Sequence, residues 1–228
     1  GDGKMSKSKG NVVSPDDLVR DYGCDSLRMY ELFVGPPELD AEWDDRGIDG
    51  VYRFLNRVWN LVMDSKDADV KATKEMIKIR NKMVYDITTR LESFSLNTVI
   101  SGFMEYNNKL IDIAKKEGGI DKETLSTFAV LLAPFAPHMA EELWQQLGHE
   151  GTVFNAGWPT YDEDAMKDDE IEVAVQINGK TRAVVTVPAD VSKEDAIKAG
   201  KEAVADKLTG TIVKEIYVPG RIINIVQK

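Results

Sequence analysis

The sequence has very little of what builds metal sites, disulfides or membrane spans. Its 228 residues include one cysteine, Cys24, and two histidines, His138 and His149. A single cysteine cannot form an internal disulfide, as is usual in a reducing cytosol, and three such widely separated residues argue against a structural zinc site. No apolar run approaches the roughly 18 residues of a membrane span, and the first residues resemble neither a secretory signal nor a transit peptide. We therefore expect a cytoplasmic protein with no membrane partner and no metal ligands.

The sequence also lacks an overall excess of positive charge. Its net charge is -10, with 43% hydrophobic and 30% charged residues, so it can bury a core, but its charge alone argues against a nucleic-acid partner. The basic residues are concentrated at the two ends. Three lysines lie within residues 1–10, and residues 173–228 hold nine Lys and Arg against six Asp and Glu, whereas residues 162–172 are acidic. This distribution permits RNA contact without requiring it.

Helical periodicity dominates the chain between residues 15 and 147. The clearest apolar stripe lies in residues 49–63 and consists of Val51, Phe54, Leu55, Val58, Trp59 and Val62, which recur at the spacing of one helix face. Further helices are expected at about residues 15–22, 25–34, 73–91, 95–118, 121–132 and 137–147. Their short connections predict a bundle of about five mostly antiparallel helices. Trp59 and Trp144 are expected in its core, and His138 is expected to be structural.

After an acidic stretch, expected to be a linker at residues 161–170, the hydrophobic period changes from 3.6 to 2. Apolar residues alternate in residues 171–177, and Asn178-Gly179 is a strong signal for a two-residue hairpin turn. Strands are also expected at residues 181–187, 211–218 and 221–226, with a helix at 192–207. The predicted fold is therefore mainly α: an antiparallel helical bundle followed by a small α/β domain of ββαββ order.

The first eleven residues carry Lys4, Lys7 and Lys9 among small polar residues, between Gly3 and Gly10. Such a loop bends easily and can direct several ammonium groups toward one point, as a polyphosphate would require. A solvated basic tail would have the same composition. Composition alone leaves both interpretations open.

The order of these residues is more informative than their composition. Lys4-Met5-Ser6-Lys7-Ser8 matches all five positions of the Lys-Met-Ser-Lys-Ser signature of class I aminoacyl-tRNA synthetases. Within this class the chain resembles the bacterial-type leucyl-tRNA synthetases, in residues 53–59 (RFLNRVW), 132–138 (LAPFAPH) and 175–182 (VQINGKTR). Membership of the isoleucyl, valyl or methionyl enzymes, or a non-catalytic RNA-binding module, are the alternatives.

The resemblance implies an enzyme that activates leucine with ATP and attaches it to leucine tRNA. Lys4 and Lys7 are then the expected catalytic residues, and Lys7, Ser6 and Ser8 the expected contacts to the phosphates of ATP, which is used with Mg²⁺. The implied segments are the end of the catalytic domain with the signature loop (1–36), an anticodon-binding-like helical domain (37–160), the linker (161–170) and a tRNA-binding domain (171–228).

The chain contains no His-Ile-Gly-His-like signature, no parallel βαβ pattern and no editing insertion. We therefore expect a C-terminal fragment that is inactive alone, is a monomer and binds no cofactor by itself, with ATP and leucine reached through the missing catalytic domain and leucine tRNA as partner. The expected tRNA contacts are Arg53, Arg57, Lys180, Arg182 and Arg221, with Lys78, Arg80 and Lys82 as further candidates. Each of these residues would equally suit an ordinary exposed position.

Overall fold

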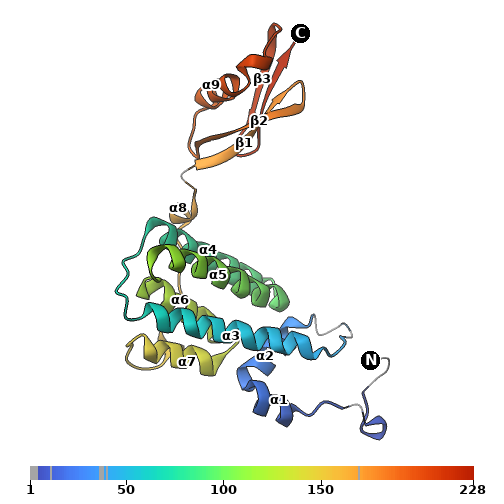
Figure 1. The fold of residues 1–228 in the computed structure, drawn as a ribbon, viewed down its shortest axis with the longest axis vertical. Coiled ribbons are helices and arrows are strands. Elements are labelled where there is room, and N and C mark those ends of the chain that lie inside the picture. The colour runs from blue at the N-terminus through green and yellow to red at the C-terminus, as the bar shows by residue number, and fades with distance from the viewer. Residues whose placement is uncertain (1–4, 11, 36–38, 40, 169) are drawn as a thin grey trace. The chain divides into compact units, whose positions relative to one another are not determined.

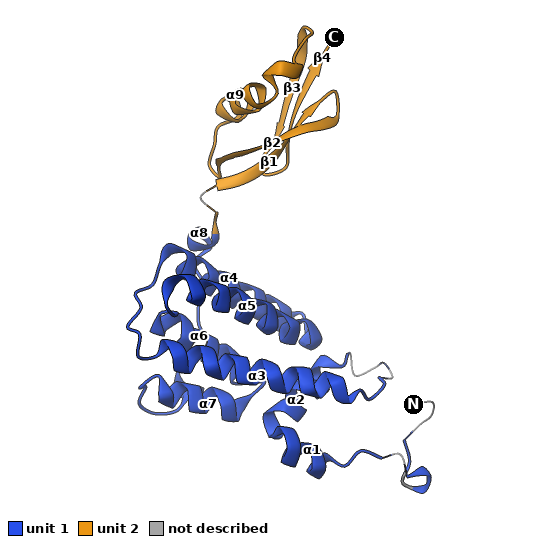
Figure 2. Cartoon of the chain, viewed as in Figure 1, with its two compact units in different colours: residues 1–166 blue, residues 167–228 orange. Residues whose placement is uncertain are grey.

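The computed structural model describes residues 5–10, 12–35, 39, 41–168 and 170–228. Among the described residues up to 166 the regular elements are all helices, and a four-stranded sheet follows (Figure 1). The chain divides into two compact units, residues 1–166 and 167–228 (Figure 2). This architecture confirms the predicted helical bundle followed by a small ββαββ domain. Among the described residues, no helix is both long and apolar enough to cross a membrane.

The helices of the first unit begin and end at residues with clear capping chemistry. They are α1 (Pro15–Tyr22), α2 (Cys24–Phe33), α3 (Asp45–Ser65), α4 (Lys74–Glu92), α5 (Leu96–Glu117), α6 (Lys122–Leu132), α7 (Pro137–Gln146) and the short α8 (Glu163–Met166). The side chains of Asp44, Thr73 and Asp121 accept hydrogen bonds from the first backbone N–H groups of α3, α4 and α6, which would otherwise lack partners. Gly118 ends α5 in the left-handed conformation.

The first unit has one hydrophobic core, built mainly by α3 to α7. Most of the predicted stripe of α3 is buried in it, and Phe103 of α5 packs edge-on against Phe128 and Phe135, with ring centroids 5.6 Å apart in each pair. The three-residue turn at 93–95 makes α4 and α5 antiparallel neighbours (Figure 1). Trp59 and Trp144 are partly buried against this core, as expected from their spacing.

Residues 156–166, here called the strap, lie along α4. The Trp158 indole donates to the Thr88 hydroxyl at 3.0 Å, and the backbone N–H of Asp162 donates to the side-chain oxygen of Asn81 at 2.8 Å. Between these contacts, the ring of Tyr161 packs edge-on against Tyr85. Tyr161 and Asp162 were expected in the linker, but they are packed on the surface of the helical unit.

The second unit is a sheet with strand order β2-β1-β4-β3, covered on one face by α9. Its elements are β1 (Glu170–Ile177), β2 (Lys180–Pro188), α9 (Lys193–Ala203), β3 (Ile212–Val218) and β4 (Ile222–Gln227). Asn178 and Gly179 have φ angles of 50° and 82°, the pair of positive values that a type I′ hairpin turn needs. β1 pairs antiparallel with β2 and parallel with β4, and Val173, Val175, Ile223 and Ile225 form a second core.

Candidate functional sites

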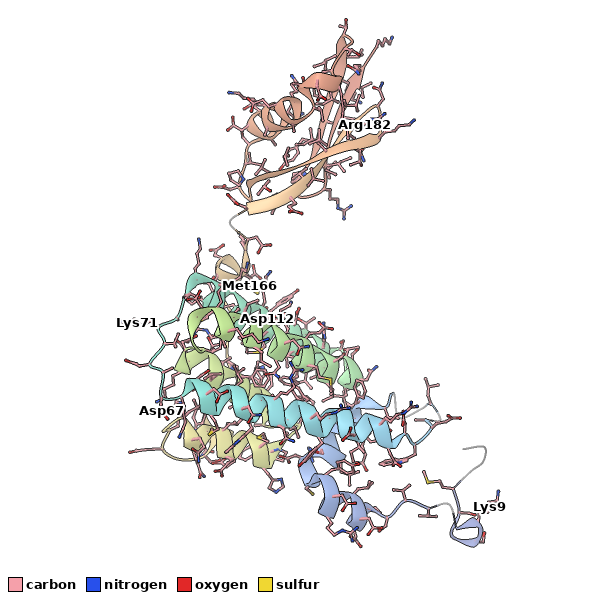
Figure 3. All side chains as sticks on the ribbon, viewed as in Figure 1. Lys9, Asp67, Lys71, Asp112, Met166 and Arg182 are labelled. Atoms are coloured by element: carbon pink, nitrogen blue, oxygen red, sulfur yellow. The ribbon has the colours of Figure 1, made fainter. Side chains whose placement is uncertain are left out.

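The described part of the lysine-rich segment is one tight helical turn. The 3-10 helix η1 spans Lys7–Lys9, and the backbone N–H of Lys9 donates to the carbonyl of Ser6 at 3.1 Å. The hydroxyl oxygens of Ser6 and Ser8 are also 3.1 Å apart. The Ser8 and Lys9 side chains are exposed, and Lys9 is marked in Figure 3. The two serine hydroxyls therefore lie close together, and hydroxyl donors of this kind suit an anion.

Lys4 and the side chain of Lys7 lie outside the described residues. Their roles at a phosphate group therefore remain predictions. The segment leads through residues 12–14 into α1, where Leu18 is buried in the helical core. The first described side chain that packs against this core is that of Val13, which is partly buried and comes before α1.

Arg53 and Arg57 of α3 lie one turn apart and are both exposed, on the side away from the buried stripe. Arg53 pairs with Asp49 at 3.0 Å. Arg57 borders a cavity of about 360 Å³ between the C-terminal halves of α3 and α5. Its lining includes the charged residues Asp64 and Lys115 and the apolar residue Ile111. The two arginines therefore share one face that a polyanion can reach.

Arg80 lies in a group of charged side chains and not on an open face of the helical unit. Its side chain is only 15% exposed, and its guanidinium lies 2.9 Å from the Glu123 carboxylate and 3.7 Å from that of Asp121. Asp121 is itself buried and caps α6. Arg80 is thus committed to joining α4 to the start of α6.

The three candidates in the second unit do not form one site. Lys180 and Arg182 lie on β2 directly after the hairpin turn, with Arg182 marked in Figure 3. Arg221 immediately precedes β4. Because β4 runs parallel to β1, the turn before β4 lies at the opposite end of the sheet from the hairpin. The structure therefore separates Arg221 from the other two residues.

Two basic residues that sequence reasoning missed lie near the hairpin. The Lys207 ammonium donates to the carbonyl of Arg182 at 3.3 Å. Lys228 follows Gln227, whose backbone N–H and carbonyl both bond to the Asn178 side chain in the turn. We call Lys180, Arg182, Lys207 and Lys228 the hairpin-end cluster. No local signal marks Lys207 or Lys228, because only the parallel pairing of β1 with β4 brings the chain end beside the hairpin.

Two groups packed in the helical unit have shifted pKa values. Burial, reinforced by a hydrogen bond to Asp86, raises the pKa of the Tyr106 phenol well above its ordinary value of 10.0. Burial, followed by the charge of Lys122, lowers the pKa of His149 from 6.5. His149 stacks on Trp144, with ring centroids 3.8 Å apart, and its Nε2 lies 2.7 Å from the Ser126 hydroxyl. These contacts join helices, so both groups have a packing role.

The helical fold and the signature segment define a class of protein that the comparisons identify. Residues 73–197 match the family described as the anticodon-binding domain of tRNA ligase, and residues 1–44 match the class I tRNA synthetases (I, L, M and V). The first match covers more than half of the chain. The chain therefore belongs to the anticodon-binding-domain family of tRNA ligases.

Within that class, the relatives that match nearly the whole chain are leucine–tRNA ligases. The chain is 47% identical to the enzyme of Fervidobacterium nodosum, over 99% of this chain and 30% of the relative, and 45% identical to that of Parabacteroides distasonis, over 98% and 24%. It also superposes on the solved agnB2 LeuRS of Agrobacterium radiobacter K84, a ternary complex with tRNA and LeuAMS. That match has a TM-score of 0.82 at 30% identity and covers 99% of this chain and 32% of the other. The expected resemblance to leucyl-tRNA synthetases is confirmed, and the chain spans about a quarter to a third of these relatives' length.

Proposed function

We propose that this chain is the C-terminal part of a leucine–tRNA ligase, which activates leucine with ATP and attaches it to leucine tRNA. One combined observation carries the proposal. The five-residue signature at residues 4–8 precedes a helical domain of the anticodon-binding family, in a chain that is 47% identical to such a ligase over 99% of its length. Under this proposal the chain supplies the segment that contacts the phosphates of ATP and the surfaces that bind tRNA.

At the ATP end, the signature segment acts on the leaving group. When the leucine carboxylate attacks the α-phosphorus of ATP, negative charge moves onto the departing pyrophosphate, and ammonium groups placed there stabilise the transition state. Lys4 and Lys7 take this catalytic role, and Ser6 and Ser8 donate to phosphate oxygens. Mg²⁺ arrives with ATP as part of the substrate. Within the described residues, no three His, Cys, Asp or Glu side chains are grouped as metal ligands.

At the tRNA end, the second unit offers a basic edge and an open sheet face. The hairpin-end cluster suits phosphate contacts. On the face away from α9, the strand register aligns four apolar residues across the sheet: Val184, Ala174, Ile222 and Val218. Val184 is 59% exposed and Val218 37% exposed. An apolar row bordered by Arg182 suits contact with bases and riboses as well as phosphates.

The decisive experiment uses the full-length protein that carries this chain. We expect this protein to attach radiolabelled leucine to leucine tRNA. We also expect it to be a monomer and to be located in the cytoplasm. Lys7→Ala should lower leucine-dependent ATP–pyrophosphate exchange about 100-fold, because it removes a charge matched to the transition state. Lys9→Ala, which removes an exposed neighbouring lysine, should stay within about threefold of the parent.

The 228-residue chain alone should form no leucyl-tRNA. If the chain alone formed leucyl-tRNA, it would contain a complete active site, and the proposal that it is an inactive part of the ligase would be wrong. A full-length protein that binds tRNA without charging it would favour a non-catalytic RNA-binding module instead. Charging with isoleucine, valine or methionine would place the protein in another branch of the same class.

A further inference from the structure

The turn between α6 and α7, residues 133–136, has no side chain that bonds to the free backbone N–H groups at the start of α7. The residue at the N-cap of α7 is Ala136, which has no side-chain acceptor, and Pro137 occupies the first helical position. The N–H groups of His138 and Met139 therefore need an acceptor from elsewhere in the chain. On the other side of the turn, the carbonyl of Pro134 lies beyond the end of α6 and needs a donor.

Asp25 of α2 supplies the acceptor, from more than 110 residues away in the sequence. One carboxylate oxygen, Oδ2, accepts from the backbone N–H of Met139 at 2.6 Å. The other, Oδ1, accepts from the backbone N–H of His138 at 3.4 Å and lies 2.9 Å from the Nδ1 atom of its ring. The Asp25 side chain is only 11% exposed. A carboxylate at this position also interacts favourably with the positive end of the α7 dipole.

Arg28 of α2 supplies the donor. Its Nε and terminal guanidinium N–H groups both donate to the carbonyl of Pro134, at 3.2 and 2.9 Å. Asp25 and Arg28 are three residues apart on a helix, so they project from the same face. We call these two residues the α2 clamp. The negative charge of Asp25 meets the N–H groups at the start of α7, and the positive charge of Arg28 meets a carbonyl just after the end of α6. The clamp thus holds the turn between these helices from both sides.

Helix α2, which carries the clamp, also packs against α3 (Figure 1). Tyr30 is 3% exposed, its hydroxyl accepts from the backbone N–H of Asp44 at 3.1 Å, and its ring lies edge-on to Trp43. α1 is joined to α2 through Gly23 alone and packs against it. A shift of α2 would therefore move α1, and with it the base of the signature segment.

We propose that Asp25 and Arg28 are positioning residues that set where the Lys-Met-Ser-Lys-Ser segment lies relative to the helical bundle. This inference rests on the proposed function, in which that segment meets ATP and the bundle meets tRNA. This role requires no contact of either side chain with the substrate. The clamp ties α2, and through it α1, to the α6–α7 turn, so that the start of α1 keeps one position relative to the bundle during activation. A misplacement of about 1 Å can cost up to about 100-fold in rate, so the clamp acts on kcat.

The test uses the full-length ligase that carries this chain and measures leucine-dependent ATP–pyrophosphate exchange, tRNA affinity and melting temperature. Asp25→Ala should lower kcat about tenfold or more, with the KM for leucine and the affinity for tRNA within about twofold of the parent. Asp25→Asn keeps one acceptor oxygen and should recover part of kcat. Asp112→Ala removes an exposed aspartate of α5 that pairs only loosely with Lys115, at 3.8 Å, and should leave kcat unchanged.

The outcomes separate this inference from the proposed function. If Asp25→Ala melts earlier but has the parent kcat below its melting temperature, the clamp is only a structural anchor and the inference is wrong. If Asp25→Ala does not fold, Asp25→Asn and Arg28→Lys decide the matter, because each keeps part of the bonding. A reduced kcat in both, with melting temperatures near the parent, supports positioning, and a parent-like kcat in both overturns it. An inactive parent enzyme would overturn the proposed function, and this inference with it.

Discussion

Arg80 gives the sharpest residue-scale prediction for stability. Its guanidinium lies 3.7 Å from the buried carboxylate of Asp121 and 2.9 Å from the carboxylate of Glu123. Removing one member of a buried ionic group leaves the other charge without compensation. We expect Arg80→Ala to lower the free energy of unfolding by about 3 kcal/mol, measured by urea denaturation of the 228-residue chain.

The matched control is Arg53→Ala. Arg53 also pairs with an aspartate, Asp49, at 3.0 Å, but both side chains are largely exposed, so the expected loss is below about 1 kcal/mol. Losses of equal size in the two variants would contradict the assignment of Arg80 to the interior.

His149 predicts a pH dependence of stability. Its pKa in the folded chain lies below the ordinary value of 6.5, so the unfolded chain binds a proton more readily than the folded one. The stabilisation is therefore complete above about pH 6.5 and is lost as the pH falls through the lowered folded pKa. We expect the melting temperature to fall more steeply between about pH 7 and about pH 5 in the parent chain than in His149→Gln. Parallel curves would show that His149 does not contribute.

Some site residues could be predicted from the sequence and others could not. The signature lysines were identifiable because a fixed order of five residues carries the information. The ion pairs of Arg80 were not predictable, because an arginine on an amphipathic helix gives no sign of the acidic partners that another helix brings to it. Lys207 and Lys228 were missed for a related reason. Their proximity to the hairpin depends on pairing between strands far apart in the chain.

At the scale of single elements, two glycines of α3 form a natural pair for testing helix packing. A β-carbon at Gly47 would overlap the ring of Tyr30, whereas one at Gly50 would meet no atom within 4 Å. Gly47→Ala must displace Tyr30 and should lower the free energy of unfolding by about 1–3 kcal/mol. Gly50→Ala should raise it by about 0.5–1 kcal/mol, because alanine is the better helix former. Urea denaturation measures both, and a stabilising Gly47→Ala would contradict the close approach of α2 to α3.

The elements themselves were largely predictable, because their signals are local. The stripe at residues 49–63 lies within α3 (Asp45–Ser65), which starts one turn earlier at the Asp44 cap. Asn178-Gly179 forms the predicted hairpin turn. The strap was not predictable in its contacts, because it has no periodicity and is held by single bonds from Trp158 and Asp162 to α4. The parallel pairing of β1 with β4 has no signature within either strand.

At the scale of the whole molecule, the net charge of -10 works against RNA, and binding must come from locally concentrated basic residues. Each cation that contacts a phosphate releases a counterion and steepens the salt dependence of affinity. The hairpin-end cluster provides such a concentration in the second unit. The helical unit offers Arg53 and Arg57 on one exposed face.

Binding of leucine tRNA to the 228-residue chain, measured over a series of salt concentrations, should depend on these basic residues. Replacing Lys180 and Arg182 together by alanine should weaken binding and make the slope of log K against log salt shallower by about one to two. The control replaces Lys193 and Lys198, two exposed lysines of α9, and should leave the slope unchanged. Both variants change the net charge equally, so a general electrostatic effect would move the two slopes together. The two slopes should differ only if tRNA makes a local contact at the hairpin end. Equal slopes would show that tRNA does not bind there.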